Sequence, residues 1–162
     1  MRRTALVVVF LSFVLVPTLI GMGVDIGARL GVQSPSLAIQ AEWDVSPSLA
    51  MGLLVETSLD LLFDPAAAQT PSIRIGLQAK YRFTHIHPAF VPYFGAVGSL
   101  GLLGADTTIA VDARAGARIY ITRDVHLFAE VAFLLFPFPD VATWADLAGF
   151  YKGLYVGFGV RL

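Results

Sequence analysis

The chain contains no cysteine among its 162 residues. Disulfide bonds and thiol chemistry are therefore excluded, and a metal site would have to use histidine and carboxylate ligands. Charge is also scarce, because charged residues make up 14% of the sequence, against about a quarter in an average soluble domain. With a formal net charge of −1, the composition gives no reason to expect a nucleic-acid partner, which would favour a basic surface.

Long apolar runs are missing from most of the chain, although apolar residues make up 56% of it and the mean hydropathy is +0.72. Beyond the N-terminus, charged residues interrupt every apolar run before it reaches the roughly 20 residues that a membrane-spanning helix needs. High hydrophobicity without helical spans favours β-structure.

The one long apolar run, residues 5–21, follows a basic pair (Arg2 and Arg3) and ends in small residues. This order is typical of a secretory signal peptide. We expect residues 1–23 to be removed after secretion and residues 24–162 to form a single domain. A membrane anchor that stays attached is the alternative, but a strand pattern follows directly, without a polar linker for an anchor to tether.

The last ten residues, 153–162, alternate between apolar side chains and small or polar ones. The apolar positions are Leu154, Val156, Phe158, Val160 and Leu162. This period of two is typical of a β-strand with one apolar face. An exposed strand of this kind invites aggregation unless its backbone is paired, so we interpret it as the closing strand of a transmembrane β-barrel.

Seven earlier segments show a similar period and are separated by turn residues. The predicted strands are residues 24–32, 37–45, 49–60, 73–83, 90–102, 109–121, 125–135 and 153–162. Most of them are long enough to cross a bilayer, which takes about 9–11 residues per strand. The fifth is rich in glycine and its facing stays open, and Leu54 breaks the alternation of the third.

The predicted connections alternate in length. Those after the second, fourth and sixth strands are tight, whereas those after the third and seventh, residues 61–70 and 137–149, run to ten residues or more. Short turns on one rim and longer loops on the other are typical of outer-membrane barrels. The sequence therefore predicts an all-β fold, an eight-stranded antiparallel up-and-down transmembrane β-barrel, with its short turns on the periplasmic side of the bacterial outer membrane.

The polar faces of the strands combine charges of both signs with many glycines and alanines. Glycine weakens strands, but the interior of an eight-stranded barrel is only just wide enough for side chains, so small residues make room for long ones. Buried charges must also be paired. We therefore expect no wide pore but an interior ion-pair network of Arg29, Glu42, Glu56, Arg74, Lys80, Arg82, Asp112, Arg114, Arg118, Glu130 and Arg161. Asp25, Asp44 and Asp60 share these polar faces.

The main alternative is a soluble up-and-down barrel of the lipocalin type, with the apolar face turned inward around a small hydrophobic ligand. The number of glycines, the strand at the C-terminus and the small number of outward charges count against it.

Aromatic residues gather near the predicted strand ends, as in the girdles that mark the two interfaces of a membrane. We expect one girdle at the short-turn rim, formed by Trp43, Tyr81, Phe83 and Tyr93. We expect the other at the opposite rim, formed by Phe133, Trp144 and Tyr151.

Segments 92–98, 124–130 and 157–162, within the architecture of residues 24–162, resemble the small eight-stranded outer-membrane proteins of Gram-negative-type bacteria, such as the OmpA transmembrane domain and OmpX. The resemblance implies contact with outer-membrane lipids and lipopolysaccharide. It also implies that the barrel-assembly machinery recognises the last strand. In that family this strand usually ends in an aromatic residue, whereas the sequence here ends in Leu162. We expect a monomer without a cofactor.

The histidines are the first residues to consider for chemistry. His85 and His87 share a predicted turn, and His126 starts a strand on the same rim. With a carboxylate such as Asp124 they could hold a metal ion. We favour the simpler interpretation that these are rim histidines at the level of the lipid headgroups, and predict no metal site.

Some eight-stranded barrels are enzymes that modify lipid A, and their deacylase type uses a His, Ser and Glu set. His126 and Glu130 lie on one face here, but Phe128 stands between them where a hydroxyl would be sought. No catalytic residues are therefore assigned.

Three hypotheses for function follow, in order of preference. The first is a structural or surface-interaction barrel with a plugged lumen. The second is a narrow channel for small solutes, and the third is a lipid A-modifying enzyme.

Overall fold

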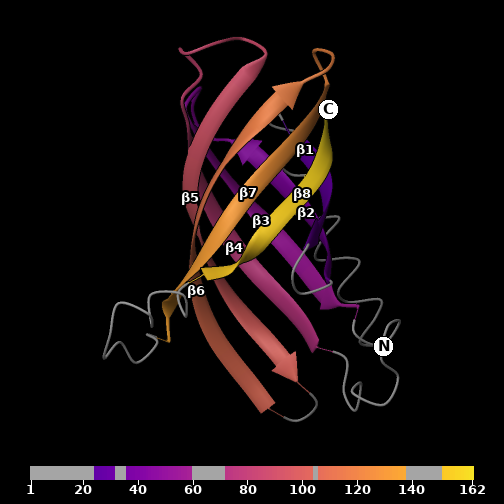
Figure 1. The fold of residues 1–162 in the computed structure, drawn as a ribbon, viewed down its shortest axis with the longest axis vertical. Coiled ribbons are helices and arrows are strands. Elements are labelled where there is room, and N and C mark those ends of the chain that lie inside the picture. The colour runs from indigo at the N-terminus through magenta and orange to yellow at the C-terminus, as the bar shows by residue number, and fades with distance from the viewer. Residues whose placement is uncertain (1–23, 32–35, 60–71, 104–105, 138–150) are drawn as a thin grey trace.

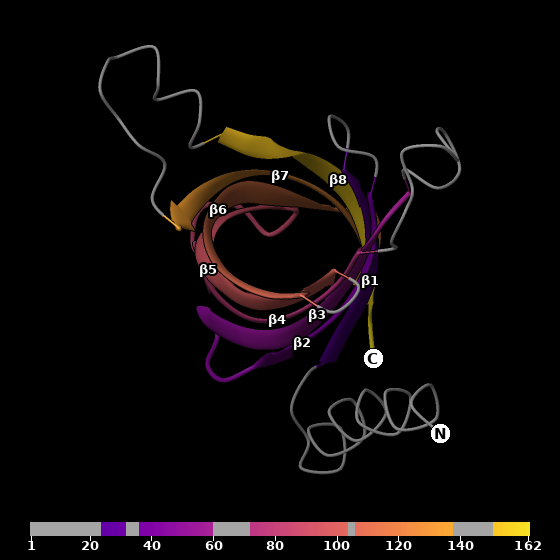
Figure 2. The same ribbon diagram turned by 90° about the horizontal axis from the view of Figure 1, so that it is seen from below.

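The computed structural model describes residues 24–31, 36–59, 72–103, 106–137 and 151–162. The strands are β1 (Val24–Gly31), β2 (Ser36–Asp44), β3 (Leu49–Ser58), β4 (Ser72–Arg82), β5 (Phe90–Leu103), β6 (Asp106–Tyr120), β7 (Val125–Phe136) and β8 (Tyr151–Arg161). Each pairs antiparallel with its neighbours in the sequence, and β8 pairs with β1 (Figure 1). The end view shows the closed ring (Figure 2). The predicted eight-stranded antiparallel barrel is confirmed.

Some predicted segments lie outside the described residues. They are the N-terminal signal segment, residues 1–23, and most of the two longer loops, within residues 60–71 and 138–150. In the part of the chain that the structure describes, no helix is both long and apolar enough to cross a membrane.

The outward face of the barrel is apolar and the inward face is polar. Leu77, at an outward position of β4, is 60% exposed, whereas the inward-facing Arg118 and Glu130 are 1% and 0% exposed. Because successive side chains of a strand point to opposite faces, the two-residue period of the sequence separates the two sets. This facing is the reverse of the soluble lipocalin-type alternative, in which the apolar face would line the interior.

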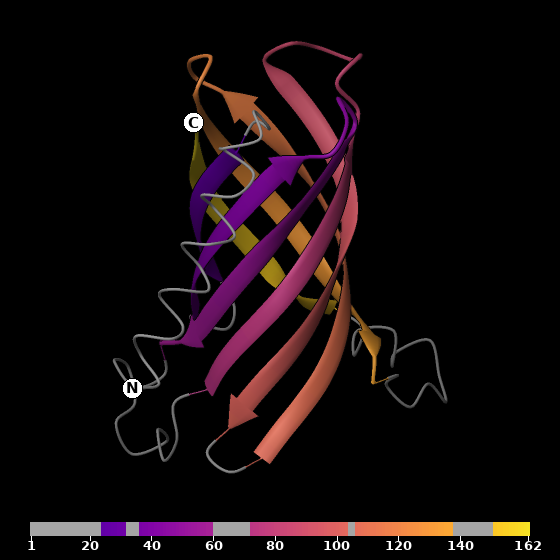
Figure 3. The same ribbon diagram turned by 180° about the vertical axis from the view of Figure 1, so that it is seen from behind.

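Strands β2 to β5 run side by side at a tilt to the long axis of the barrel (Figure 3). Such a tilt is what allows a sheet to close. The strands differ in length, from 8 residues in β1 to 15 in β6. β6 begins at Asp106, earlier than predicted, because Thr107 and Thr108 continue the ladder opposite Leu102 and Gly101 of β5.

Where β1 and β8 close the barrel, several inward-facing pairs contain at least one glycine. Gly27 pairs with Gly159, and Arg29 pairs with Gly157. A Cβ atom at Gly157 would lie 2.6 Å from Cζ of Phe128, which is closer than van der Waals contact permits. The glycine therefore leaves room inside the barrel for a large neighbouring side chain.

The facing of β5, which stayed open from the sequence, follows from its pairing with β4 and β6. Tyr93 points inward and is 2% exposed, whereas Phe94 points outward and is 54% exposed. Leu54, the exception in the pattern of β3, also lies inside, where it packs with Ala38 and Val97. The interior therefore contains one small apolar cluster among its charges.

Candidate functional site in the barrel interior

Arg118 of β6 organises the half of the interior nearest the short turns. Its Nη1 donates a hydrogen bond to Oδ2 of Asp25 at 2.9 Å, and its Nη2 donates to Oε2 of Glu42. Gln78 also donates to Glu42, at 3.2 Å. All four side chains are buried, so each charge depends on its partners for stabilisation.

Arg82 of β4 extends this set of ion pairs to the rim. It pairs with Asp44, and its Nη1 lies 3.8 Å from Oδ2 of Asp25. Arg161, at the end of β8, donates to the other oxygen of Asp44 at 2.5 Å. The Arg161 side chain is partly exposed, so the ion pairs reach solvent at the short-turn rim.

Glu130 of β7 is the centre of the other half. It accepts hydrogen bonds from Arg29, from Nη1 of Arg114 at 2.5 Å and from the hydroxyl of Tyr93 at 3.0 Å. The two guanidinium groups also lie over the ring of Tyr155, with Cζ 4.8 Å and 5.3 Å from its centroid. Charge-assisted hydrogen bonds and cation–π contacts thus both hold the arginines.

A β-bulge brings a lysine into this half of the interior. The register between β7 and β8 shifts between Ala132 and Phe133, which leaves Lys152 unpaired in the ladder. Lys152 donates a hydrogen bond to Asp112, whose Oδ2 also lies 3.5 Å from Nη2 of Arg114. Bulges commonly redirect a side chain in this way.

Lys80 joins the two halves. Its Nζ lies 2.6 Å from Oε1 of Glu42 and 3.6 Å from Oε2 of Glu130. The ion pairs therefore form a continuous chain along the inside of the barrel, from Arg161 at the short-turn rim to Lys152 near the opposite rim.

Among the residues predicted for an interior network, Arg74 is the one that the structure does not bring into this chain. It faces Glu56 in the register of β3 and β4, but it makes no ion pair with a described residue. Glu56 instead accepts a hydrogen bond from Oγ of Ser36 at 2.8 Å and lies 3.5 Å from Arg29. The other predicted residues all take part in the ion pairs described above.

The predicted network left out three members of the chain of ion pairs. Alternation places Asp25 and Asp44 on the same polar faces, and the structure adds them to the ion pairs. Lys152 could not be found in this way, because a bulge, and not strand parity, directs it inward. The inward facing of Tyr93 could not be predicted, because the glycines of β5 leave no clear alternation between apolar and polar side chains.

The prediction that Tyr93 belongs to an aromatic girdle is wrong. Its ring lies inside the barrel because β5 presents odd-numbered residues to the interior. At the outward surface near the same rim, Phe94 lies beside two predicted girdle residues. The ring of Tyr81 is 5.3 Å from that of Phe83 and 5.6 Å from that of Phe94, centroid to centroid.

The remaining predicted girdle residues occupy different positions. Phe133 and Tyr151 contact each other near the opposite rim, with ring centroids 6.0 Å apart. Trp43 is partly buried at the short-turn end of β2, where it packs against a small cluster that includes Val24. Trp144 lies outside the described residues.

The three histidines do not form a common site. His85 and His87 are exposed in the turn after β4, whereas His126 is buried, so its interpretation as a rim histidine at headgroup level is wrong. The His126 ring lies 5.2 Å from that of Tyr120 and 6.2 Å from that of Phe128. Among the described residues, no group of three or more histidines and carboxylates could hold a metal ion.

Neither a protein-family model nor a curated protein matches the sequence. Solved structures share its architecture. A de novo designed transmembrane β-barrel, TMB2.3, has a TM-score of 0.56 and 15% identity, over 87% of this chain and 93% of its own. A second structure, from work on de novo design of transmembrane β-barrels, has a TM-score of 0.53 and 15% identity, with coverages of 87% and 94%. The Yersinia pestis outer membrane protein Ail has a TM-score of 0.51 and 9% identity, with coverages of 87% and 98%. At these identities the likeness is one of fold.

Proposed function

We propose that the chain is a monomeric, integral outer-membrane β-barrel with a plugged, ion-paired lumen and a structural or surface-interaction role. The observation that carries the proposal is the separation of its two faces. A continuous chain of ion pairs runs along the interior, while large apolar side chains are exposed on the outside. An apolar outer band with a polar interior suits a lipid environment and is unfavourable in water.

Buried ion pairs inside the barrel favour a structural role over transport. The Arg118 side chain of β6 reaches across the lumen to Glu42 of β2, and Glu130 of β7 reaches past β8 to Arg29 of β1. A solute would have to break buried ion pairs to pass, and an orphaned buried charge costs about 3–5 kcal/mol. Surface interactions would then involve the rims and the apolar outer band.

The surroundings of the barrel follow from the same proposal. Outer-membrane lipids and lipopolysaccharide would contact the apolar band, and the barrel-assembly machinery would recognise β8. This strand completes the ring, since the backbone N–H of Leu162 donates to the carbonyl oxygen of Val24 at 2.8 Å.

The first test is the electrophoretic mobility of detergent-extracted protein, unboiled against boiled, together with cell fractionation. We expect a mobility shift on heating and recovery in the outer-membrane fraction. Soluble protein in the periplasm, with no shift, would contradict the proposal.

Two further measurements test the proposed role. In planar bilayers we expect no steady conductance, and a steady ohmic current would favour the narrow channel instead. Mass spectrometry of lipid A from cells with and without the protein should give identical spectra, whereas a changed acylation pattern would favour a lipid A-modifying enzyme.

A further inference from the structure

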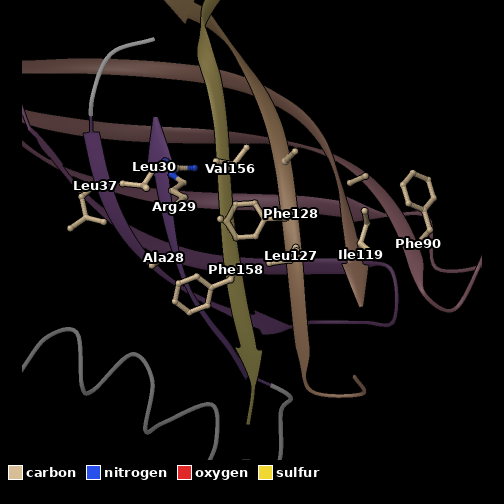
Figure 4. A pocket seen from close by; sticks show the side chains of 13 residues that line it. Ala28, Arg29, Leu30, Leu37, Phe90, Ile119, Leu127, Phe128, Val156 and Phe158 are labelled. Atoms are coloured by element: carbon tan, nitrogen blue, oxygen red, sulfur yellow. The ribbon is translucent and has the colours of Figure 1, made fainter. Parts of the chain in front are cut away.

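The outer surface of the barrel contains an apolar groove of about 730 Å³ that crosses β5 to β8, β1 and β2 (Figure 4). Its lowest part is made by small side chains. Ala117 of β6 and Ala129 of β7 are direct partners in the ladder. Pockets of roughly 300–1,000 Å³ are large enough to hold a small ligand, so the groove has the size of a binding site.

Larger apolar side chains border this low part. Ile119 pairs with Leu127, and Leu127 pairs with Phe158, so the three form one row across β6, β7 and β8 (Figure 4). All three are about half exposed and point away from the interior. The groove therefore offers almost only hydrocarbon surface, which suits a hydrocarbon chain.

An exposed cation follows the groove along the strands, in the turn at the rim. The tight turn between β6 and β7, residues 121–124, follows the row of Ile119 and Leu127 by about two residues, or roughly 7 Å of strand. Arg123 in this turn is exposed and makes no ion pair with a described residue. Arginine is well suited to binding phosphate. An anionic group would thus lie at the rim while a connected hydrocarbon chain lay in the groove.

We infer that the groove binds one anionic phospholipid, with an acyl chain over Ala117 and Ala129 and its negatively charged headgroup at Arg123. The inference rests on the proposed membrane location. Charge complementarity determines the choice of occupant, because a hydrocarbon chain that carries a net negative headgroup suits both the apolar lining and the exposed cation. The neighbouring Asp124 is also exposed and should weaken the binding of an anionic headgroup.

Native mass spectrometry of the full chain in non-ionic detergent tests the inference. The protein would be mixed with phosphatidylglycerol or with phosphatidylcholine of identical acyl chains. We expect one phosphatidylglycerol molecule to be retained in preference to phosphatidylcholine. Arg123→Gln should abolish this preference, and Asp124→Asn should strengthen it. Equal retention of both lipids by the unaltered chain, or an unchanged preference in Arg123→Gln, would overturn the inference.

A second set of variants tests the groove itself. Ala129→Phe should fill its low part and abolish lipid retention. Ala96→Phe is the matched control, since Ala96 is an exposed alanine on β5 outside the groove and its replacement should leave retention unchanged. Equal retention by the two variants, or a second protein chain in place of lipid, would overturn the inference. Should Ala129→Phe not fold, Ala117→Phe serves the same purpose.

The change in electrophoretic mobility on heating distinguishes a failure of this inference from a failure of the proposed function. A barrel that shows the shift but retains no phospholipid contradicts the lipid site alone. A chain without the shift contradicts the membrane barrel, and the lipid site with it.

Discussion

Lys80 lies between two carboxylates that belong to different halves of the interior, with its Nζ 2.6 Å from Glu42 and 3.6 Å from Glu130. The same ammonium group lies 4.9 Å from the centroid of the Tyr93 ring. A cation in this position contributes to the stabilisation of both carboxylates and connects ion pairs that would otherwise form two separate groups.

Replacement of Lys80 by methionine should therefore lower the free energy of unfolding by about 3 kcal/mol, because two buried carboxylates lose a shared cation. Urea titration in phospholipid vesicles, followed by tryptophan fluorescence, measures the change. Arg74→Met is the matched control, since Arg74 faces inward on the same strand but makes no ion pair with a described residue. Equal losses of unfolding free energy in the two variants would contradict the stabilising role of the ion pairs that Lys80 makes.

Tyr93 and Tyr81 provide a test of inward against outward facing. Tyr93→Phe removes a buried hydrogen bond to Glu130 and should cost about 2 kcal/mol, as is typical for bonds to charged groups. Tyr81→Phe changes an outward, partly exposed ring and should alter stability by less than about 0.5 kcal/mol. The same urea titration compares them, and the opposite order would contradict the facing of β5.

The glycines of the barrel differ in how much space surrounds them, and therefore in whether an added Cβ atom would collide with neighbouring atoms. Gly157→Ala should destabilise the barrel by about 1–3 kcal/mol, because the new methyl group would be forced against Phe128 and the backbone of β1. Gly98→Ala is the control, since a Cβ at this outward position meets no atom within 4 Å. We expect Gly98→Ala to be neutral or slightly stabilising. The same urea titration gives both free energies of unfolding, and a similar loss in both variants would contradict the argument.

Contact between lipid and the outer face of the barrel can be tested by placing an arginine at an outward position. Leu77→Arg, in the middle of β4, should cost about 2–4 kcal/mol in vesicles, as for a cation at the bilayer midplane. Ile121→Arg, in the turn at the rim, should cost only about 0–1 kcal/mol. If both changes are nearly neutral in the urea titration, the outer face is in contact with water.

Much of the fold could be predicted from local pattern alone. In a strand, side-chain direction alternates because of backbone geometry, so a residue such as Arg118 or Leu77 reveals its facing through its immediate neighbours. A polar face with long charged side chains and glycines then requires a confined interior, and an even number of such strands can close into a ring. These properties depend on short stretches of chain, which is why the sequence by itself determined the strands, their order and the polarity of the two faces.

The ion-pair partners were decided only by the tertiary structure. Arg29 of β1 and Glu130 of β7 are 101 residues apart in the chain and meet because closure of the barrel places both strands beside β8. Which carboxylate an arginine reaches depends on strand register and on the shape of the closed ring, and neither leaves a signal in one segment. For the same reason Arg74 faces Glu56 without pairing, and a bulge brings Lys152 inside. Alternation is a property of each strand, whereas pairing across the lumen is a property of the closed barrel.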